Sequence, residues 1–338
     1  MLVDATAGGL VFPGQTLSPV RKTPGSYDYP ESAGVKQLRD LYGETEHGYS
    51  QEQSSNSILV TSGVKESILL LALLRRETGS RVWLPQLCWP GYQSIFQFLH
   101  YDILYYRHDN IPEDLQVARK HDLIVVNNPH NPTGYCLDEN SRQALLEYTQ
   151  SNGNMLIVDE CLQHCTFAPS TRFSRALENF PNVVIVDSLA KWCCMPGVRI
   201  GFIIASSKWI TLCSTLKNKL LNPTSHIAQL EAMYNLENAK QWLQRTKTSL
   251  LPVMESAKRC LKNYGIQVHG ETLMYLWIES DHPSAIVNSE IRLGSKAFKI
   301  VPGPNFGAPK NFARFSYVDT AANTIVIPFK GVRVSKYG

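Results

Sequence analysis

Short apolar runs that alternate with helical patterns constrain the fold of this chain more than any other feature of its sequence. Runs such as LIVVN at 123–127, MLIV at 155–158 and VVIV at 183–186 are continuously apolar and rich in β-branched residues. Such runs are typical of strands that are buried on both faces. Because these strands alternate with helices between residues 58 and 205, we predict an α/β fold in which helices cover both faces of a mostly parallel sheet.

The pattern changes after residue 208, where strands and helices no longer alternate. Helical periodicity covers 209–221 and 227–260, and we expect the second helix to be interrupted near Pro252. Short strand-like runs follow, among them ARFSY at 313–317. This order predicts a smaller α+β subdomain in the carboxyl-terminal part of the chain.

These patterns divide the chain into three parts. Residues 1–30 are rich in Gly, Pro and Thr, and we expect an extended arm there. A short helix is expected at 34–42, followed by a loop over the polar residues 43–57. The predicted parts are an arm at 1–30 that belongs to the small domain, a large domain at 31–208, and a helical link with the small α+β domain at 209–338.

The composition argues against several classes of function. Hydrophobic residues make up 43% of the 338 residues and charged residues 18%, as in ordinary soluble domains. The net charge of +4 is mild, and no basic run is dense enough to indicate nucleic acid binding. No apolar stretch is long enough to span a membrane, and the first residues lack the pattern of a signal peptide. We therefore expect neither a nucleic acid nor a membrane as a partner.

The eight cysteines are scattered and show no paired CxxC spacing. In a chain of this size we predict that they are reduced thiols, which favours a cytoplasmic location. Cys161, His164 and Cys165 stand close together, but the four-ligand pattern of a zinc site is missing. We expect no metal site.

A lysine follows the strand predicted at 183–186, between a serine and an arginine. These residues are Ser188, Lys191 and Arg199. A lysine amine can form a Schiff base, and a hydroxyl and a guanidinium can bind a phosphate. The stretch therefore suits a phosphorylated aldehyde that is held covalently, although by itself it fits an ordinary surface lysine better.

Two further features stand where predicted strands meet helices. Thr61-Ser62-Gly63 opens the helix that begins at about Val64, and the unpaired N–H groups of such a turn bind anions. Trp89 stands at the start of another helix, where an aromatic side chain either packs or offers a stacking surface. A plain turn and simple packing remain the alternatives.

Asn131 and Asp159 each follow a buried strand. Asn131 lies in NPHNPTGY at 128–135, where prolines, a glycine and asparagines force an irregular turn. Asp159 ends the strand at 155–158, where a carboxylate is costly unless it faces a cation or a protonated ring nitrogen. A helix cap or a salt bridge in a loop is the alternative for Asp159.

The carboxyl ends of parallel strands share one edge of a sheet, so these side chains can converge on one ligand. Together they provide an amine, an aromatic face, a carboxylate, an amide and phosphate-binding groups. Pyridoxal phosphate requires this set, because its aldehyde needs a lysine and its ring nitrogen needs an acidic partner.

The chain resembles the fold-type I pyridoxal-phosphate enzymes, and specifically the class I/II aminotransferase family. The resemblance rests on motifs whose order and spacing agree over nearly the whole chain. These motifs are AGGLVFP (7–13), YPESAGVKQLR (29–39), TSGVKESI (61–68), LPQLCWPGY (84–92), NPHNPTG (128–134), DE (159–160), SLAK (188–191) and GVRIGF (197–202). The resemblance implies a sheet of the seven-stranded type in a large domain that binds the cofactor pyridoxal 5'-phosphate.

The resemblance also implies a role for each site residue. Lys191 is expected to hold the cofactor and to act as the catalytic acid and base at the substrate α-carbon. Cofactor contacts are implied for Tyr29, Gly63, Val64, Lys65, Trp89, Asn131, Asp159, Ser188, Lys191 and Arg199. Substrate contacts are implied for Gly9 and for Arg314, the latter through a bidentate fork to the α-carboxylate. Tyr29 is expected to reach the phosphate of a neighbouring subunit, which implies a homodimer with shared active sites.

One position departs from the family pattern. Leu162 stands three residues after Asp159, where the family usually has a tyrosine that donates a hydrogen bond to the ring hydroxyl. Gln163 and His164 are the neighbouring candidates to replace that donor.

Three hypotheses about function follow. The first is an aminotransferase that acts on an amino acid with a free α-carboxylate, through aldimine and quinonoid intermediates, and hands the amino group to a keto acid. The second keeps the cofactor but changes the reaction to decarboxylation, elimination or replacement, cyclisation or oxidation, as the loss of the tyrosine at Leu162 suggests. The third is a non-catalytic binding protein that kept the fold.

Overall fold

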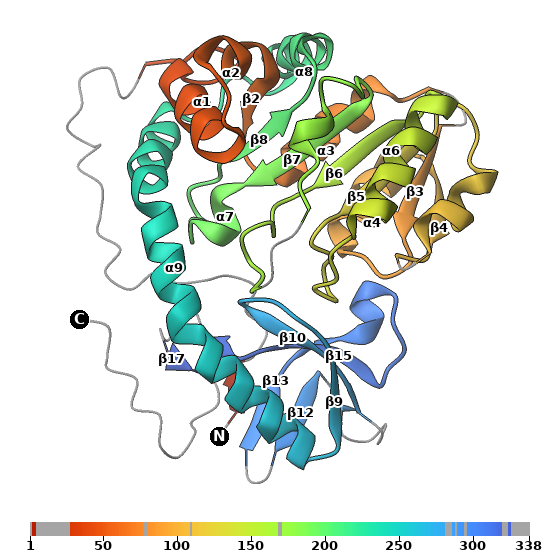
Figure 1. The fold of residues 1–338 in the computed structure, drawn as a ribbon, viewed down its shortest axis with the longest axis vertical. Coiled ribbons are helices and arrows are strands. Elements are labelled where there is room, and N and C mark those ends of the chain that lie inside the picture. Colours follow the sequence, from red (N-terminus) through yellow and green to blue (C-terminus); the bar gives the residue numbers. More distant parts are fainter. Residues whose placement is uncertain are drawn as a thin grey trace.

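The computed structural model shows a large α/β part joined to a smaller part built around antiparallel strands (Figure 1). It describes residues 2–4, 28–77, 80–108, 110–167, 171–280, 286–287, 289–293, 296–319 and 324–325. A long helix, α9 (His226–Asn263), runs along one side of the molecule from the large part to the small part. Among the helices in these ranges, none is both long enough and apolar enough to cross a membrane.

Seven strands form the large sheet, and their order confirms the predicted α/β class. The order is β2 (Ile58–Thr61), β8 (Gly201–Ile204), β7 (Val183–Ser188), β6 (Met155–Asp159), β5 (Leu123–Asn127), β3 (Arg81–Pro85) and β4 (Asp102–Tyr106). Within this sheet, β8 alone runs antiparallel to its neighbours. The other strands are parallel, so they end at the same edge.

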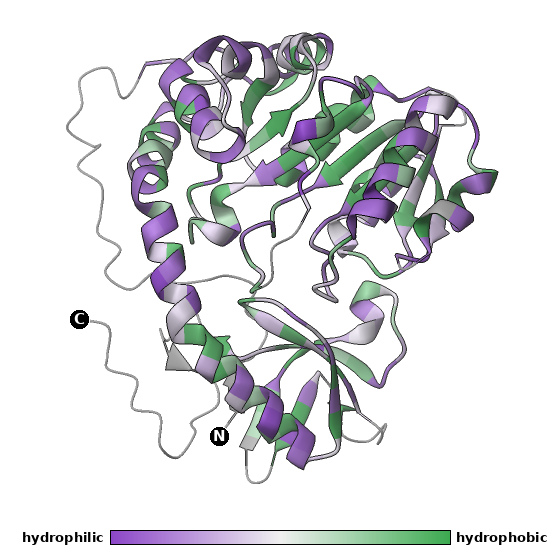
Figure 2. Cartoon of the chain, viewed as in Figure 1, coloured by the Kyte–Doolittle hydropathy of each residue, from purple (hydrophilic) through white to green (hydrophobic). Residues whose placement is uncertain are grey.

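Helices cover both faces of this sheet because successive strand residues point to opposite sides. Ile124 and Val126 of β5 pack into one core cluster, and Leu123 and Val125 pack into the other. The first cluster includes residues of α1 (Lys36–Tyr42), α6 (Glu139–Asn152) and α9; the second includes residues of α3 (Val64–Leu74), α4 (Pro90–Phe98) and α8 (Ser207–Leu220). The middle parts of β5, β6 and β7 are accordingly hydrophobic, whereas many hydrophilic residues lie on the helices (Figure 2).

The predicted loop at 43–57 is wrong. Instead, a π-helix covers Gly43–His47, and α2 covers Gln51–Ser57. Ser50 and Gln53 form a reciprocal capping box that supplies the first turn of α2 with hydrogen-bond partners. The polar composition concealed these turns, because their stability comes from capping and from contacts with distant segments rather than from an apolar periodicity.

The predicted interruption near Pro252 is also wrong, since α9 continues through that residue. Pro252 lies on the exposed side of the helix, while Leu250, Val253 and Met254 are buried against the core. The proline removes one backbone hydrogen bond, but packing of the buried face compensates for it.

Among the residues that the structure describes, the strands of the smaller part form two small sheets and a strand pair. The first sheet is antiparallel, in the order β14 (Val301–Pro302), β15 (Phe312–Ser316), β10 (Tyr275–Ser280) and β9 (Ile266–Glu271). The second has the order β1 (Leu2–Asp4), β13 (Lys296–Lys299), β12 (Glu290–Leu293) and β11 (Ile286–Val287). β16 (Val318–Asp319) pairs with β17 (Thr324–Ile325). This part matches the predicted α+β subdomain, while the boundaries at residues 30 and 208 stay a prediction.

The remaining short elements connect these layers. They are α5 (Ile111–Asp114), α7 (Leu189–Trp192) and 3-10 turns at Leu115–Val117, Ser174–Ala176 and Gly303–Phe306. None of the eight cysteines forms a disulfide in this structure, and their reduced state in the cell stays a prediction.

Candidate active site

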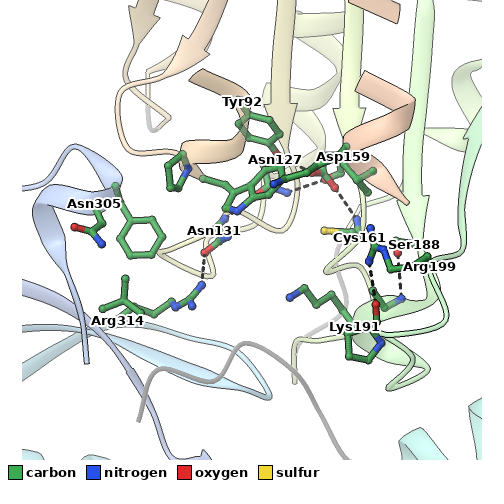
Figure 3. A pocket seen from close by; sticks show the side chains of 18 of the residues that line it. Tyr92, Asn127, Asn131, Asp159, Cys161, Ser188, Lys191, Arg199, Asn305 and Arg314 are labelled. Atoms are coloured by element: carbon green, nitrogen blue, oxygen red, sulfur yellow. Dashed lines mark hydrogen bonds between the residues drawn. The ribbon is translucent and has the colours of Figure 1, made fainter. Parts of the chain in front are cut away.

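A cavity of about 1000 Å³ lies between the carboxyl edge of the large sheet and the small antiparallel sheet. Most of the residues that the sequence singled out line it (Figure 3). They are Val64, Lys65, Trp89, Asn131, Asp159, Ser188, Lys191, Arg199 and Arg314. Lys191 and Arg314 extend toward each other from opposite sides of this cavity.

Asp159 is a buried carboxylate at the end of β6. The hydroxyl of Tyr92 donates to its Oδ2 at 2.5 Å, and the backbone N–H of Cys161 donates to its Oδ1 at 3.0 Å. Burial raises the pKa of Asp159, and these two hydrogen bonds and the charge of Lys191 oppose that rise. A cation next to this carboxylate would therefore be strongly favoured.

The amino-terminal end of α3 forms an anion-binding corner. Gly63 caps this helix with φ 107°, a conformation that glycine adopts without strain. A Cβ at this position would lie 2.8 Å from Nη2 of Arg199. Val64 and Lys65, whose N–H groups belong to the unpaired first turn, line the cavity together with Arg199. The guanidinium of Arg199 donates to the carbonyls of Pro196 and Ser62, both at 2.9 Å, and these bonds fix it beside the helix end.

Ser188 and Lys191 stand where β7 passes into α7. Ser188 caps α7, because its Oγ accepts a hydrogen bond from the N–H of Ala190 at 3.1 Å. The same hydroxyl donates to the carbonyl of Ile200 at 2.8 Å. Lys191 follows on the short helix, and its side chain reaches into the cavity.

Trp89 is the residue before α4, and its indole ring folds over Gly91. The ring meets Tyr92 edge to face, with 5.3 Å between the ring centroids. The Nζ atom of Lys65 lies 5.5 Å from the centre of the indole, which is within cation–π distance.

Two asparagines fix the irregular segment after β5. The N–H of Asn131 donates to Oδ1 of Asn127 at 2.7 Å, and Nδ2 of Asn127 donates to the carbonyl of Asp159 at 2.9 Å. The segment is thereby anchored to the end of β6, which holds Asn131 at the cavity.

Arg314 approaches the cavity from β15 of the small sheet. Its guanidinium carbon lies 4.8 Å from the ring centre of Tyr275 and 5.3 Å from that of Phe306. Burial lowers the pKa of Arg314, and the neighbouring Tyr275 opposes that change. A carboxylate is the natural partner for a guanidinium held between two aromatic rings in this way.

Some predicted residues are not brought to the cavity. Tyr29 is 88% exposed and does not line it, and Gly9 lies outside the described residues. Leu162 is buried in the core of the large part. His164 does not replace the missing tyrosine, because its Nε2 bonds to the buried carboxylate of Glu46 at 2.5 Å.

Several cavity residues were missed from the sequence. They are Tyr92, Asn127, Cys161, Val301, Asn305 and Phe306, together with smaller lining residues. Three of them carried a signal: Tyr92 stands one helical turn after Trp89, Asn127 ends a predicted strand, and Cys161 follows the strand-end acidic pair. Nothing in the local sequence marked Asn305 or Phe306.

Comparison of the sequence with known proteins identifies the family of this chain. The sequence profile of aminotransferase class I and II matches residues 20–327. An aspartate aminotransferase of Thermococcus kodakarensis is 26% identical over 296 residues, which is 86% of this chain and 77% of that protein. A (5-formylfuran-3-yl)methyl phosphate transaminase of Methanocaldococcus jannaschii is 23% identical over 308 residues, 88% of this chain and 81% of that protein.

Solved structures show the same fold. A double mutant of the Thermus thermophilus aspartate aminotransferase superposes with a TM-score of 0.78 at 21% identity, covering 95% of this chain and 89% of that one. This similarity concerns the fold, whereas the sequence profile spans most of the chain. The chain therefore belongs to the class I and II aminotransferase family, a family of transferases.

Proposed function

We propose that this chain is a pyridoxal-phosphate-dependent aminotransferase that acts on amino acids with a free α-carboxylate. One observation carries the proposal: Lys191, Asp159, Asn131 and Arg314 all open onto the same cavity. The family uses this cofactor, so the question is whether the residues of this chain fit it.

The side chains fit the cofactor in chemistry. When bound, pyridoxal phosphate supplies an aldehyde and a ring that withdraws electrons from the substrate α-carbon. Asp159 provides a buried anion for the ring nitrogen, and its two hydrogen-bond donors hold it in place. The first turn of α3 and Arg199 provide donors for the phosphate, and Ser188 would join them when its hydroxyl turns away from the carbonyl of Ile200. Trp89 offers an aromatic face at the cavity.

Lys191 and Arg314 divide the work on the substrate. Arg314 binds the α-carboxylate through two parallel hydrogen bonds, which orients the α-carbon. Lys191 would hold the aldehyde of the cofactor. Once released, its amine would take the proton from the substrate α-carbon and give it to the former aldehyde carbon on the other side of the amino nitrogen. The aromatic rings beside Arg314 exclude water from this pair and strengthen it.

The experiment is a borohydride reduction. Purified protein is incubated with pyridoxal phosphate, reduced and digested, and the labelled peptide is identified by mass spectrometry. We expect the label on Lys191, its loss in Lys191→Ala, and its retention in Lys65→Ala, which removes the amine of another lysine in the cavity. Equal labelling of Lys191→Ala, or no label on the unmodified protein, would contradict the proposal.

The reaction type is tested with an amino-acid panel. Transamination is expected to convert the cofactor to pyridoxamine phosphate and to release a keto acid. The second candidate function is an enzyme that uses the same cofactor for a different reaction. It is favoured by Leu162, an apolar, buried residue where the family has a tyrosine. Release of ammonia or CO₂ without the pyridoxamine form would favour that second candidate.

We also propose a homodimer in which Tyr29 completes the active site of the partner subunit. Its 88% exposure in the single chain leaves the phenol available for such a contact. A mixture of Lys191→Ala and Tyr29→Ala subunits is expected to regain activity above either parent, because a mixed dimer contains one intact site. A monomer by light scattering, or no recovery on mixing, would refute the shared site.

A further inference from the structure

The orientation of the Asn131 amide is set by two residues of the small sheet. The hydroxyl of Tyr275 lies 3.2 Å from Oδ1 of Asn131, and Nη1 of Arg314 lies 3.4 Å from the same atom. An arginine can only donate hydrogen bonds, so the atom that faces it must be the amide oxygen. Burial raises the pKa of Tyr275, which keeps its phenol protonated as a second donor.

With its oxygen held, Asn131 must turn its Nδ2 group the other way. Among the described residues none accepts a hydrogen bond from Nδ2, although Asn131 lines the cavity. The Nδ2 group is therefore free to donate a hydrogen bond to a ligand in the cavity. Its direction depends on the hydrogen bonds that Tyr275 and Arg314 donate to Oδ1 of the same side chain.

The two donors to Oδ1 are not equivalent. Arg314 lines the cavity and is the proposed partner of the substrate carboxylate, so its N–H groups are shared once substrate binds. Tyr275 is 1% exposed and does not line the cavity. Its bond to Asn131 is thus the one that persists through the reaction, while its ring supports the guanidinium of Arg314 at 4.8 Å.

We propose that Tyr275 is a positioning residue that points the amide of Asn131 at the cofactor ring hydroxyl. This inference rests on the proposed function. The family's usual tyrosine is replaced by Leu162 in this chain. Here a different phenol, that of Tyr275 in the small sheet, would act on the ring hydroxyl indirectly, through Asn131. The small sheet thereby orients both the substrate fork and a donor to the cofactor.

The test is an absorbance titration of the cofactor-loaded protein against pH. In the loaded protein, the ring oxygen of the cofactor and the nitrogen of Lys191 would share one proton. A hydrogen bond donated to that oxygen makes it less basic, so the shared proton is lost at lower pH. Removing the bond should therefore move the midpoint of the titration to higher pH. We expect Asn131→Ala to raise the midpoint by about one pH unit, and Tyr275→Phe by about half a unit, as for loss of one ordinary hydrogen bond.

Two variants separate positioning from structural damage. Tyr317→Phe removes another buried phenol of the small part, whose hydroxyl donates to the carbonyl of Thr272 at 2.9 Å, and it should leave the midpoint unchanged. In an Asn131→Ala background, Tyr275→Phe should add no further shift, because the residue acts through the amide. Tyr275→Phe keeps the ring under Arg314, so KM for an amino acid should change less than kcat.

The outcomes are distinct. An unshifted midpoint in Tyr275→Phe, a shift of equal size in Tyr317→Phe, or an additive shift on top of Asn131→Ala overturns the inference and leaves the proposed function standing. Absence of any cofactor band in the unmodified protein overturns the proposed function itself.

Discussion

The two walls of the cavity are built on different principles. On the wall of the large sheet, Asp159 and Ser188 each end a parallel strand, and Asn131 follows one within a few residues. On the wall of the small sheet, Arg314 lies in the middle of β15, and Phe306 lies in a 3-10 turn.

The difference teaches where function can be found in a sequence. Parallel strands that end at one edge gather their last residues at one place, so a polar residue at a strand end already indicates its position. In an antiparallel sheet, neighbouring strands end at opposite edges, and the face on which a residue lies depends on register. We therefore expect the side of the cavity formed by the large sheet (the large wall) to bind the cofactor. We expect the side formed by the small sheet (the small wall) to select and orient the substrate.

The largest expected effect is on the large wall. Asp159→Asn nearly keeps the shape of the side chain, but it removes the charge and replaces one of the two acceptor oxygens by an NH2 group. We therefore expect kcat to fall roughly 10²–10³-fold, as for loss of a preorganised electrostatic contact. The matched control is Asp187→Asn, which removes another buried carboxylate that is bonded to a phenol, that of Tyr42, at 2.6 Å. An equal fall of kcat in Asp187→Asn would mean that Asp159 contributes no more to the reaction than another buried carboxylate does.

On the small wall, Arg314→Lys replaces a planar fork by a single point of charge. Loss of one charge-assisted hydrogen bond should lower kcat/KM for an amino acid by about 10–100-fold, mainly through KM. The control uses a second substrate. An amine that lacks a carboxylate should react equally fast with Arg314→Lys and with the unmodified protein. An equal loss with that amine would mean that the small wall acts on the chemistry and not on binding.

A smaller effect is expected at Gly91, on which the Trp89 indole rests. A Cβ at Gly91 would overlap the benzene ring of that indole and force it to move. Gly91→Ala should weaken cofactor binding roughly tenfold, in line with the cost of overpacking. The measurement is a fluorescence titration of each protein with pyridoxal phosphate. Gly197→Ala, whose Cβ would meet open space, should leave the affinity for the cofactor unchanged.

The smallest effect on activity is expected away from both walls, at His47. Burial, followed by the charge of Arg172, lowers the pKa of His47 from 6.5 to about 4. Between these values the unfolded chain binds a proton that the folded chain does not, so stability falls as the pH decreases from 6.5 to 4, by up to about 3 kcal/mol.

His47→Phe should flatten this part of the stability curve and leave kcat unchanged. Urea unfolding at pH 4.5 and pH 7.5 measures the change. His100→Asn, at an exposed histidine, should retain the pH dependence of the unmodified protein. If His47→Phe keeps the full acid sensitivity, then another buried group causes it.

The sequence was informative where a residue's position follows from its own strand. The ends of β5, β6 and β7 lie where their apolar runs stop, so Asn131, Asp159 and Ser188 were found in advance. Phe306 and Tyr275 could not be found in this way, because their contacts come from segments distant in sequence. The helical turns at 43–57 were missed for the same reason, since Glu46 is buried among charged partners such as Arg172.

The pairing of β1 with β13 has a consequence for synthesis on the ribosome. Leu2 lies opposite Ala297, so β1 finds its partner only after the residues up to 297 have been made. At common translation rates, that delay is about 15 to 60 s. The strands of the large sheet all lie between residues 58 and 204 and are made well before that partner. The sheet edge where Asp159 and Ser188 lie can thus form while the nascent chain is still growing, whereas both small sheets must wait for strands that are made after residue 295.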